Sequence, residues 1–143
     1  EYPMVLPNHR AFHTPLVSAV ADAVVSSWTL DWRAPRHHLL LGNGAIATPW
    51  SADPHALAEY TLREQVVRPF RLASALRTGL RELAPDAIVL TGPGESIGGA
   101  LGAAILAEGW RGLRDRDAFR RRQSEDPVLL SLARPQQRSR VLG

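Results

Sequence analysis

The chain has 143 residues, 45% of them hydrophobic and 22% charged, which is the composition of one ordinary globular domain. It has no cysteine, which excludes a disulfide and a thiolate zinc site. Arginines interrupt its apolar stretches before they reach the ~18 residues of a membrane span, and no signal peptide is evident. We therefore expect a cytoplasmic protein without a membrane partner.

The charge is unevenly distributed along the chain. All 17 basic residues are arginine, and nine of them, against four acidic residues, lie in residues 111–143. A basic tail can bind nucleic acid, a membrane surface or an acidic protein, and the alternative is a solvated helix face. Because the arginines are not interleaved with aromatic residues and no recognition motif occurs, we expect no nucleic-acid partner.

In the first half of the chain, Thr14 and Pro15 are typical of a helix start. The run "HHLLLGN" at residues 37–43 predicts a buried strand and a turn. Asp53 and Pro54 predict a second helix, through residue 67. The first of these helices is expected to bury one face, made of Leu16, Val17, Val20, Val24 and Trp28.

In the second half, residues 68–83 predict an amphipathic helix, and "APDAIVLT" predicts a turn and a buried strand. A glycine-rich loop and a helix over 97–110 follow. Short helices are expected around Asp117–Arg122 and, behind Asp126 and Pro127, through "VLLSLAR". The apolar side of the helix predicted over residues 68–83 comprises Phe70, Leu72, Ala73, Leu76, Leu80 and Leu83.

Helices that alternate with two short strands predict an α/β fold. Two strands are too few for a parallel sheet covered on both faces, so the sequence is interpreted as the back end of a larger α/β domain. The start at Glu1 rather than methionine fits a piece of a longer protein, or an experimental boundary.

The glycine-rich loop contains Gly94-Glu95-Ser96-Ile97-Gly98, which matches the G-x-S-x-G pattern of a nucleophile elbow. A strand before it and a helix after it fit that motif. The other interpretation is a glycine-rich turn that matches the pattern by chance. A phosphate-binding loop is a third interpretation, but the loop has no P-loop lysine and no evident acidic partner.

Among the five histidines, His13 has the best physical case for chemistry. It stands at a helix start, where unpaired N–H groups and the positive end of the dipole favour a neutral ring that can act as a base. The alternative is that His13 only hydrogen-bonds the loop. The adjacent His37 and His38 would point to opposite faces of a strand, so no metal site is expected.

Four segments resemble, in order, the malonyl-CoA:acyl-carrier-protein transacylases and the acyltransferase domains of polyketide and fatty acid synthases. They are "RAFHTPLV", "LLLGNGAIATPW", "LREQVVRPFRL" and "AIVLTGPGESIGGAL", from Arg10 to about Leu106. The resemblance implies the C-terminal part of the α/β-hydrolase-like large subdomain of an acyltransferase. Residues 1–110 would be the C-terminal half of the acyltransferase core, with the catalytic-histidine motif, and residues 111–143 a basic helical extension.

In that family a serine attacks the acyl-CoA thioester, and a histidine takes the serine proton and then activates the phosphopantetheine thiol of the carrier. The resemblance implies that His13 is this histidine and that the main-chain carbonyl of Gln65 holds its other ring nitrogen. It implies that Phe12 lies beside the acyl group, where a bulky ring would favour malonyl over methylmalonyl. The alternative is that Phe12 only packs against the helix start.

The resemblance places the serine upstream of His13, outside these residues, and aligns Ser96 with a glycine turn. The expected function is malonyl transfer from malonyl-CoA to an acyl carrier protein, with no cofactor. The chain would be inactive alone and would need the N-terminal half of the same domain. Its C-terminal arginines could steer the acidic carrier. A serine hydrolase with Ser96 as nucleophile and a non-catalytic structural or binding fragment remain as alternatives.

Overall fold

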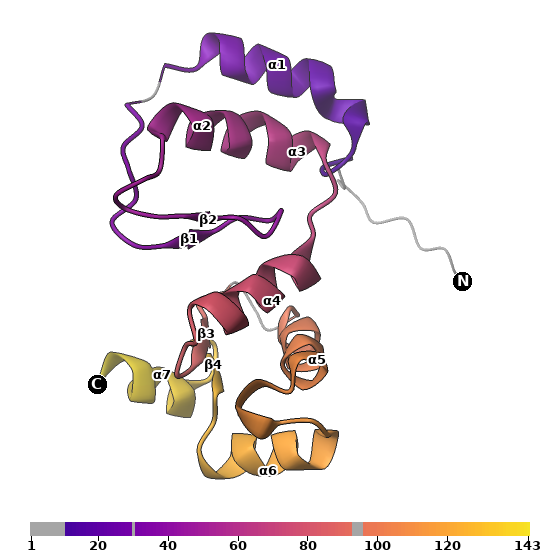
Figure 1. Cartoon of the computed structure of the whole chain (residues 1–143), viewed down its shortest axis with the longest axis vertical. Coiled ribbons are helices and arrows are strands. Elements are labelled where there is room, and N and C mark those ends of the chain that lie inside the picture. Colours follow the sequence, from indigo (N-terminus) through magenta and orange to yellow (C-terminus); the bar gives the residue numbers. More distant parts are fainter. Residues whose placement is uncertain (1–10, 30, 93–95) are drawn as a thin grey trace. The chain divides into compact units, whose positions relative to one another are not determined.

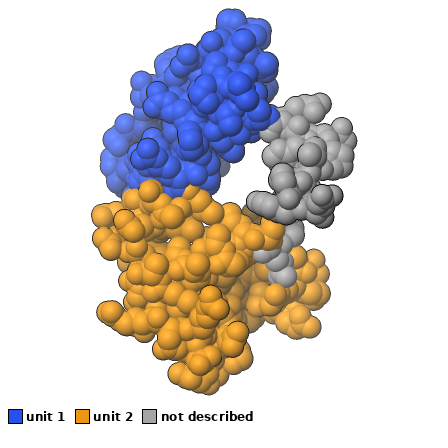
Figure 2. Space-filling model, turned by 90° about the vertical axis from the view of Figure 1, so that its right-hand side faces the viewer, with its two compact units in different colours: residues 1–71 blue, residues 72–143 orange. Residues whose placement is uncertain are grey.

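The computed structural model describes residues 11–29, 31–92 and 96–143, and the chain forms two compact units, residues 1–71 and 72–143 (Figure 1, Figure 2). Helices are combined with two small sheets, so the expected mixture of helix and sheet is present. The larger hydrolase-like subdomain remains a prediction, as does the boundary at residue 110.

In unit 1, a 3₁₀ turn at Pro15–Val17 leads into helix α1, Ser18–Ser27. The predicted start is confirmed, because the Thr14 hydroxyl accepts a hydrogen bond from the N–H of Leu16 and Pro15 is the first residue of the turn. The predicted strand of residues 37–43 begins only at residue 39.

A second rod in unit 1 consists of α2, Pro54–Glu59, a π-helical turn, Tyr60–Glu64, and α3, Gln65–Val67. The Asp53 carboxylate accepts a hydrogen bond from the N–H of His55, which confirms the predicted helix start. Helix α1 packs along this rod, and the two lie side by side in Figure 1.

The buried face predicted for the first helix is wrong for its largest members. Leu16, Val20 and Trp28 are 84%, 64% and 55% exposed, whereas Ala21 is buried. The small side chain of Ala21 lets α1 approach the π-helical turn, so the packed face is rotated away from the stripe of large apolar residues. Unit 1 contains nothing that covers this stripe among its described residues.

The sheet of unit 1 is an antiparallel hairpin of β1, Leu39–Leu40, and β2, Ile46–Ala47. The expected single buried strand is therefore one arm of a hairpin, and its Leu39 is 44% exposed. His37 and His38 precede the strand instead of lying on it. The argument that a strand would point these two rings to opposite faces therefore does not apply.

Unit 2 begins with α4, Leu72–Glu82, which is followed by β3, Ile88–Leu90, and α5, Gly98–Glu108. All three were predicted, but Phe70 lies outside α4. The buried face of α4 is Ala75, Gly79 and Leu80. The core of unit 2 consists of Leu80, Ile105, Trp110, Leu113 and Val128.

The prediction of a helix through "VLLSLAR" is wrong. Leu129–Ser131 form strand β4, which pairs in parallel with β3, with Val89 opposite Leu130. The Gln123 side chain accepts hydrogen bonds from the N–H groups of Val128 and Leu129 and donates one to the Leu129 carbonyl. Burial and this clamp outweigh the helix-start signal of Asp126 and Pro127.

Helix α6, Arg116–Glu125, confirms the short helix expected there, and α7, Pro135–Leu142, was not expected. The parallel pair joins β3, which precedes the predicted boundary at residue 110, to β4, which follows that boundary. No helix of the described ranges combines the length and the apolar character that crossing a membrane requires.

Candidate functional site

His13 is fixed to the end of α3 by two hydrogen bonds. Its ring Nδ1 lies 2.7 Å from the main-chain carbonyl oxygen of Gln65, and its main-chain N–H donates to the carbonyl of Val66 across 2.7 Å. The contact between the ring and Gln65 is the one that the resemblance implies. It joins two segments 52 residues apart in sequence.

Local chemistry explains why these two carbonyls are available. The last carbonyls of a helix have no partner within the helix, and the residue four positions after Gln65 is Pro69, which has no N–H. The last helical bond runs from the Arg68 N–H to the Glu64 carbonyl across 3.0 Å. Arg68 itself is extended, as residues before proline tend to be. His13 therefore caps a helix end that proline leaves open.

The cap determines the tautomer of the His13 ring. A carbonyl oxygen can only accept, so Nδ1 carries the hydrogen and donates it to Gln65. In the neutral ring, Nε2 then holds a lone pair and can accept a proton. The backbone of His13 has φ 66°, an uncommon conformation for a residue other than glycine. Such outliers cluster at functional sites.

The sequence expectation about the surroundings of the ring did not include the acceptor at Nδ1. It placed unpaired N–H groups of the helix start around His13, but Nδ1 faces a carbonyl at the end of another helix. The free N–H at the start is instead capped by Thr14. The Gln65 carbonyl selects which nitrogen of the neutral ring carries the hydrogen, and the expected effect of the helix start on the charge of the ring stays a prediction.

The π-helical turn Tyr60–Glu64 lies directly before Gln65. π-Helical turns are rare and occur often at functional sites, because they add a residue and re-aim the following helix. Arg63 in this turn donates to the Asp22 carboxylate of α1 across 2.6 Å. This hydrogen bond, with the charge of Asp22, raises the pKa of Arg63, and the pair ties α1 to the turn.

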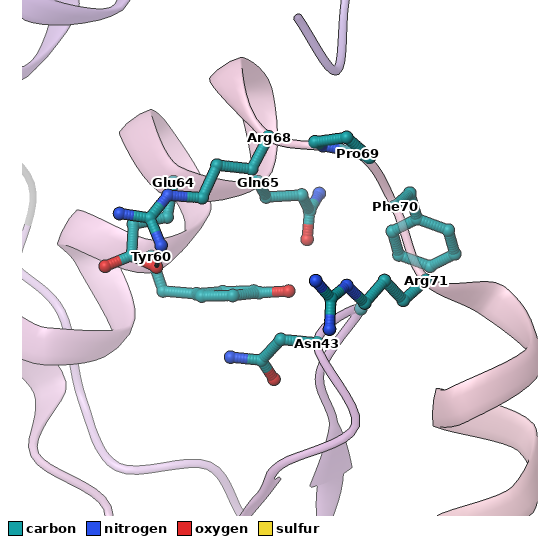
Figure 3. A pocket seen from close by; sticks show the side chains of 9 residues that line it. Asn43, Tyr60, Glu64, Gln65, Arg68, Pro69, Phe70 and Arg71 are labelled. Carbon is teal, nitrogen blue, oxygen red and sulfur yellow. Dashed lines mark ion pairs between the residues drawn. The ribbon is translucent and has the colours of Figure 1, made fainter.

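A hollow of about 270 Å³ lies in unit 1 beside the same helix end (Figure 3). The Phe70 ring at its wall also contacts the His13 ring, with a centroid distance of 5.8 Å. Gly42 lies against this ring so closely that a Cβ atom there would overlap Phe70. The lining residues are Gly42, Asn43, Tyr60, Glu64, Gln65, Arg68, Pro69, Phe70 and Arg71.

No family model, no curated protein and no solved structure matches this chain. The assignment of chemistry therefore depends on the geometry and on the resemblance of the four segments.

The remaining predicted residues are placed as follows. Phe12, beside His13, is 57% exposed, and its role toward an acyl group stays a prediction. Ser96 is exposed in the turn before α5, while Gly94 and Glu95 of the G-x-S-x-G pattern lie outside the described residues. All histidines of the sequence precede residue 72, so unit 2 has no histidine that could serve Ser96 as a base.

Sequence reasoning missed the hollow. Tyr60, Phe70 and Arg71 come from two sides of the open helix end, and the segment "LREQVVRPFRL", which contains Phe70 and Arg71, gave neither of them a role in a pocket. Two signals pointed toward them: Pro69, which stops the helix, and Gly42, which permits the close approach of Phe70. The hollow forms where the hairpin turn and the helix end lie next to each other, and their contact cannot be predicted from the sequence.

The arginines of the C-terminal part are partly paired within unit 2. Arg111 pairs with Asp86, and Arg122 and Arg140 both pair with Asp126. Over the ranges that the structure describes, no cluster of three or more histidine, cysteine or acidic residues could hold a metal ion. Arginines without an ion pair to a described residue include Arg114, Arg116, Arg121 and Arg138.

Proposed function

We propose that this chain supplies the histidine base of an acyltransferase that moves a malonyl group from coenzyme A to an acyl carrier protein. The observation that carries the proposal is the 2.7 Å contact between His13 Nδ1 and the Gln65 carbonyl. In that family's logic a backbone carbonyl takes the place of the aspartate that holds a catalytic histidine. The proposal includes a serine on a segment outside these residues.

The chemistry uses His13 Nε2 twice. In the first half, Nε2 takes the serine O–H proton while the serine oxygen attacks the thioester carbonyl, and the proton then goes to the departing coenzyme A sulfur. In the second half, Nε2 takes the thiol proton of the carrier, the sulfur attacks the acyl-serine, and the proton returns to the serine oxygen. Malonyl is transferred, and the serine and His13 are restored.

The exposed apolar stripe along the 3₁₀ turn and α1 supports the proposed missing segment. Leu16 and Val20 form an apolar stripe close to His13 in sequence, and Leu16 is 84% exposed. Burying a large apolar side chain contributes roughly 1.5–3 kcal/mol, so this stripe favours a covering segment. We propose that the segment with the serine covers it, which would bring the nucleophile to the His13 side of unit 1.

The test is malonyl loading by intact mass on the longest natural form of the protein. His13→Ala should slow loading and carrier transfer by ~10²–10⁴-fold, the usual contribution of a general base. His55→Ala, at another exposed helix start of unit 1, is the matched control and should load normally. Ser96→Ala should also load. Loss of loading in Ser96→Ala, with malonyl mapped to Ser96, would replace this proposal by the hydrolase alternative.

A further inference from the structure

The hollow beside His13 gathers polar side chains that lack partners. Figure 3 shows the Gln65 amide, the Tyr60 hydroxyl and the Arg71 guanidinium pointing into the same space. None of the three side chains hydrogen-bonds to any residue that the structure describes. Such a convergence of unused donors on a hollow is typical of a binding site.

The backbone on both sides of these donors is held in place. The N–H of Arg71 donates to the Gly42 carbonyl across 2.9 Å, which joins the hairpin turn to the segment after the helix end. The Asn43 Oδ1 atom accepts the N–H of Ala45 across 2.9 Å, so the amide NH₂ of Asn43 remains available as a donor. Both sides of the hollow therefore have defined geometry.

The charge of the hollow is positive. Glu64 and Arg68 also line it and face each other across 3.8 Å, so their charges offset one another. Arg71 has no ion pair with a described residue, and its guanidinium remains as an unbalanced cation. A guanidinium donates two parallel hydrogen bonds to a carboxylate or a phosphate, which are the groups it recognises best.

The wall of the hollow is apolar. Pro69 and the Phe70 ring form it, and Phe70 is 44% exposed. We propose that this hollow binds a small organic anion, whose carboxylate or phosphate group is held by Arg71, Tyr60 and the amides, and whose apolar body lies on Phe70. This goes beyond the acyltransferase proposal, because it requires neither a serine nor an acyl-enzyme.

The test uses the 143-residue chain, ¹⁵N-labelled, titrated at constant ionic strength with benzoate, phenyl phosphate and neutral benzamide. At least one of the two anions should bind saturably, with shifts at Gly42, Asn43 and Phe70. Benzamide, which shares the ring but lacks the charge, should bind at least about tenfold more weakly. Binding of benzoate alone identifies a carboxylate site, binding of phenyl phosphate alone a phosphate-ester site, and binding of both the shared oxyanion chemistry.

Arg71→Gln should weaken anion binding by about tenfold or more, because it removes the charged, two-pronged donor. Arg33→Gln is the matched control, since it makes the same change at an exposed arginine of unit 1 that pairs with Asp31. Tyr60→Phe should weaken binding to a smaller extent. Shifts that do not saturate, equal loss in Arg33→Gln, or benzamide binding as tight as that of the anions would overturn the proposal. Anion binding should persist in His13→Ala, which removes the proposed catalytic histidine. The anion proposal and the acyltransferase proposal can therefore fail independently of each other.

Discussion

His13 and Gln65 are joined through the main chain of one and the ring of the other. The His13 Nδ1 donates to the Gln65 carbonyl across 2.7 Å, and the Gln65 side chain plays no part in this bond, since it lines the hollow. Pro69 keeps the carbonyl available, because proline has no N–H to offer it. One proline thus creates the acceptor that fixes the histidine.

Pro69→Ala should weaken the bond between His13 and Gln65. Alanine at residue 69 supplies an N–H and lets Arg68 become helical, so the helix can extend and occupy the Gln65 carbonyl itself. Nitrogen NMR of the histidine rings should show less Nδ1–H tautomer at His13. Gln65→Ala is the matched control: it keeps the carbonyl and should keep the tautomer. An extended helix with an unchanged tautomer would contradict this explanation.

Gly42→Ala should destabilise unit 1 by about 1–3 kcal/mol, as overpacking does. The new Cβ overlaps the Phe70 ring, which must swing away from His13. Urea denaturation measures the loss, and the chemical shifts of the His13 ring report the departure of Phe70. Gly99→Ala in α5 is the control, because a Cβ there meets nothing within 4 Å and stability should hold or rise slightly. Equal effects of the two changes would refute the packing argument.

Gln123→Met should destabilise unit 2 by about 1–3 kcal/mol, since the backbone groups of Val128 and Leu129 lose their partners. Methionine keeps the length of the side chain and removes only its polar groups. Thermal or urea unfolding gives the difference. Gln136→Met, at an exposed position of α7, should have little effect. A stable Gln123→Met protein would show that the clamp does not hold β4.

Glu108 makes unit 2 sensitive to acid. Its side chain is 9% exposed and binds Arg77 and Arg81 at 2.8 and 2.7 Å. The hydrogen bond from Arg77, with that from Arg81, lowers the pKa of the Glu108 carboxyl, against the opposing effect of burial. The unfolded chain then binds the proton first, so the stabilisation is full above the ordinary glutamate pKa of about 4.3 and is lost as the pH falls below it.

Urea midpoints measured from pH 7 down to pH 3 test this directly. Glu108→Gln should flatten the acid limb of the profile, and Glu125→Gln, an exposed glutamate of α6 without an ion pair to any described residue, should leave it unchanged. The same acid limb in all three proteins would exclude Glu108 as its cause.

The sequence predicted helix starts well where a single residue determines them. Thr14 and Asp53 cap the helices that they were expected to cap, because an N-cap depends on a side chain and an N–H two positions away. The sequence did not predict elements whose structure depends on residues that are distant in the chain. Leu130 lies in a strand because β3 pairs with it and Gln123 holds its neighbours, whereas Asp126 and Pro127 locally favour a helix.

The candidate site shows the same division. The contact of His13 with the Gln65 carbonyl followed from the resemblance, but the availability of that carbonyl could be understood only with the helix end in view. The hollow with Arg71 depends on Gly42 of the hairpin meeting Phe70 beyond the helix. Periodicity and motifs carry no information about such a meeting.

The measurement that tests the central claim most directly is the tautomer of His13 in the unaltered chain, read from the nitrogen shifts of its ring. The bond to the Gln65 carbonyl predicts a hydrogen on Nδ1 and a lone pair on Nε2 in the neutral ring. A ring with its hydrogen on Nε2 would contradict the account, because the lone pair would then lie on Nδ1, which faces the Gln65 carbonyl, and Nε2 could not take a proton from a serine or a thiol.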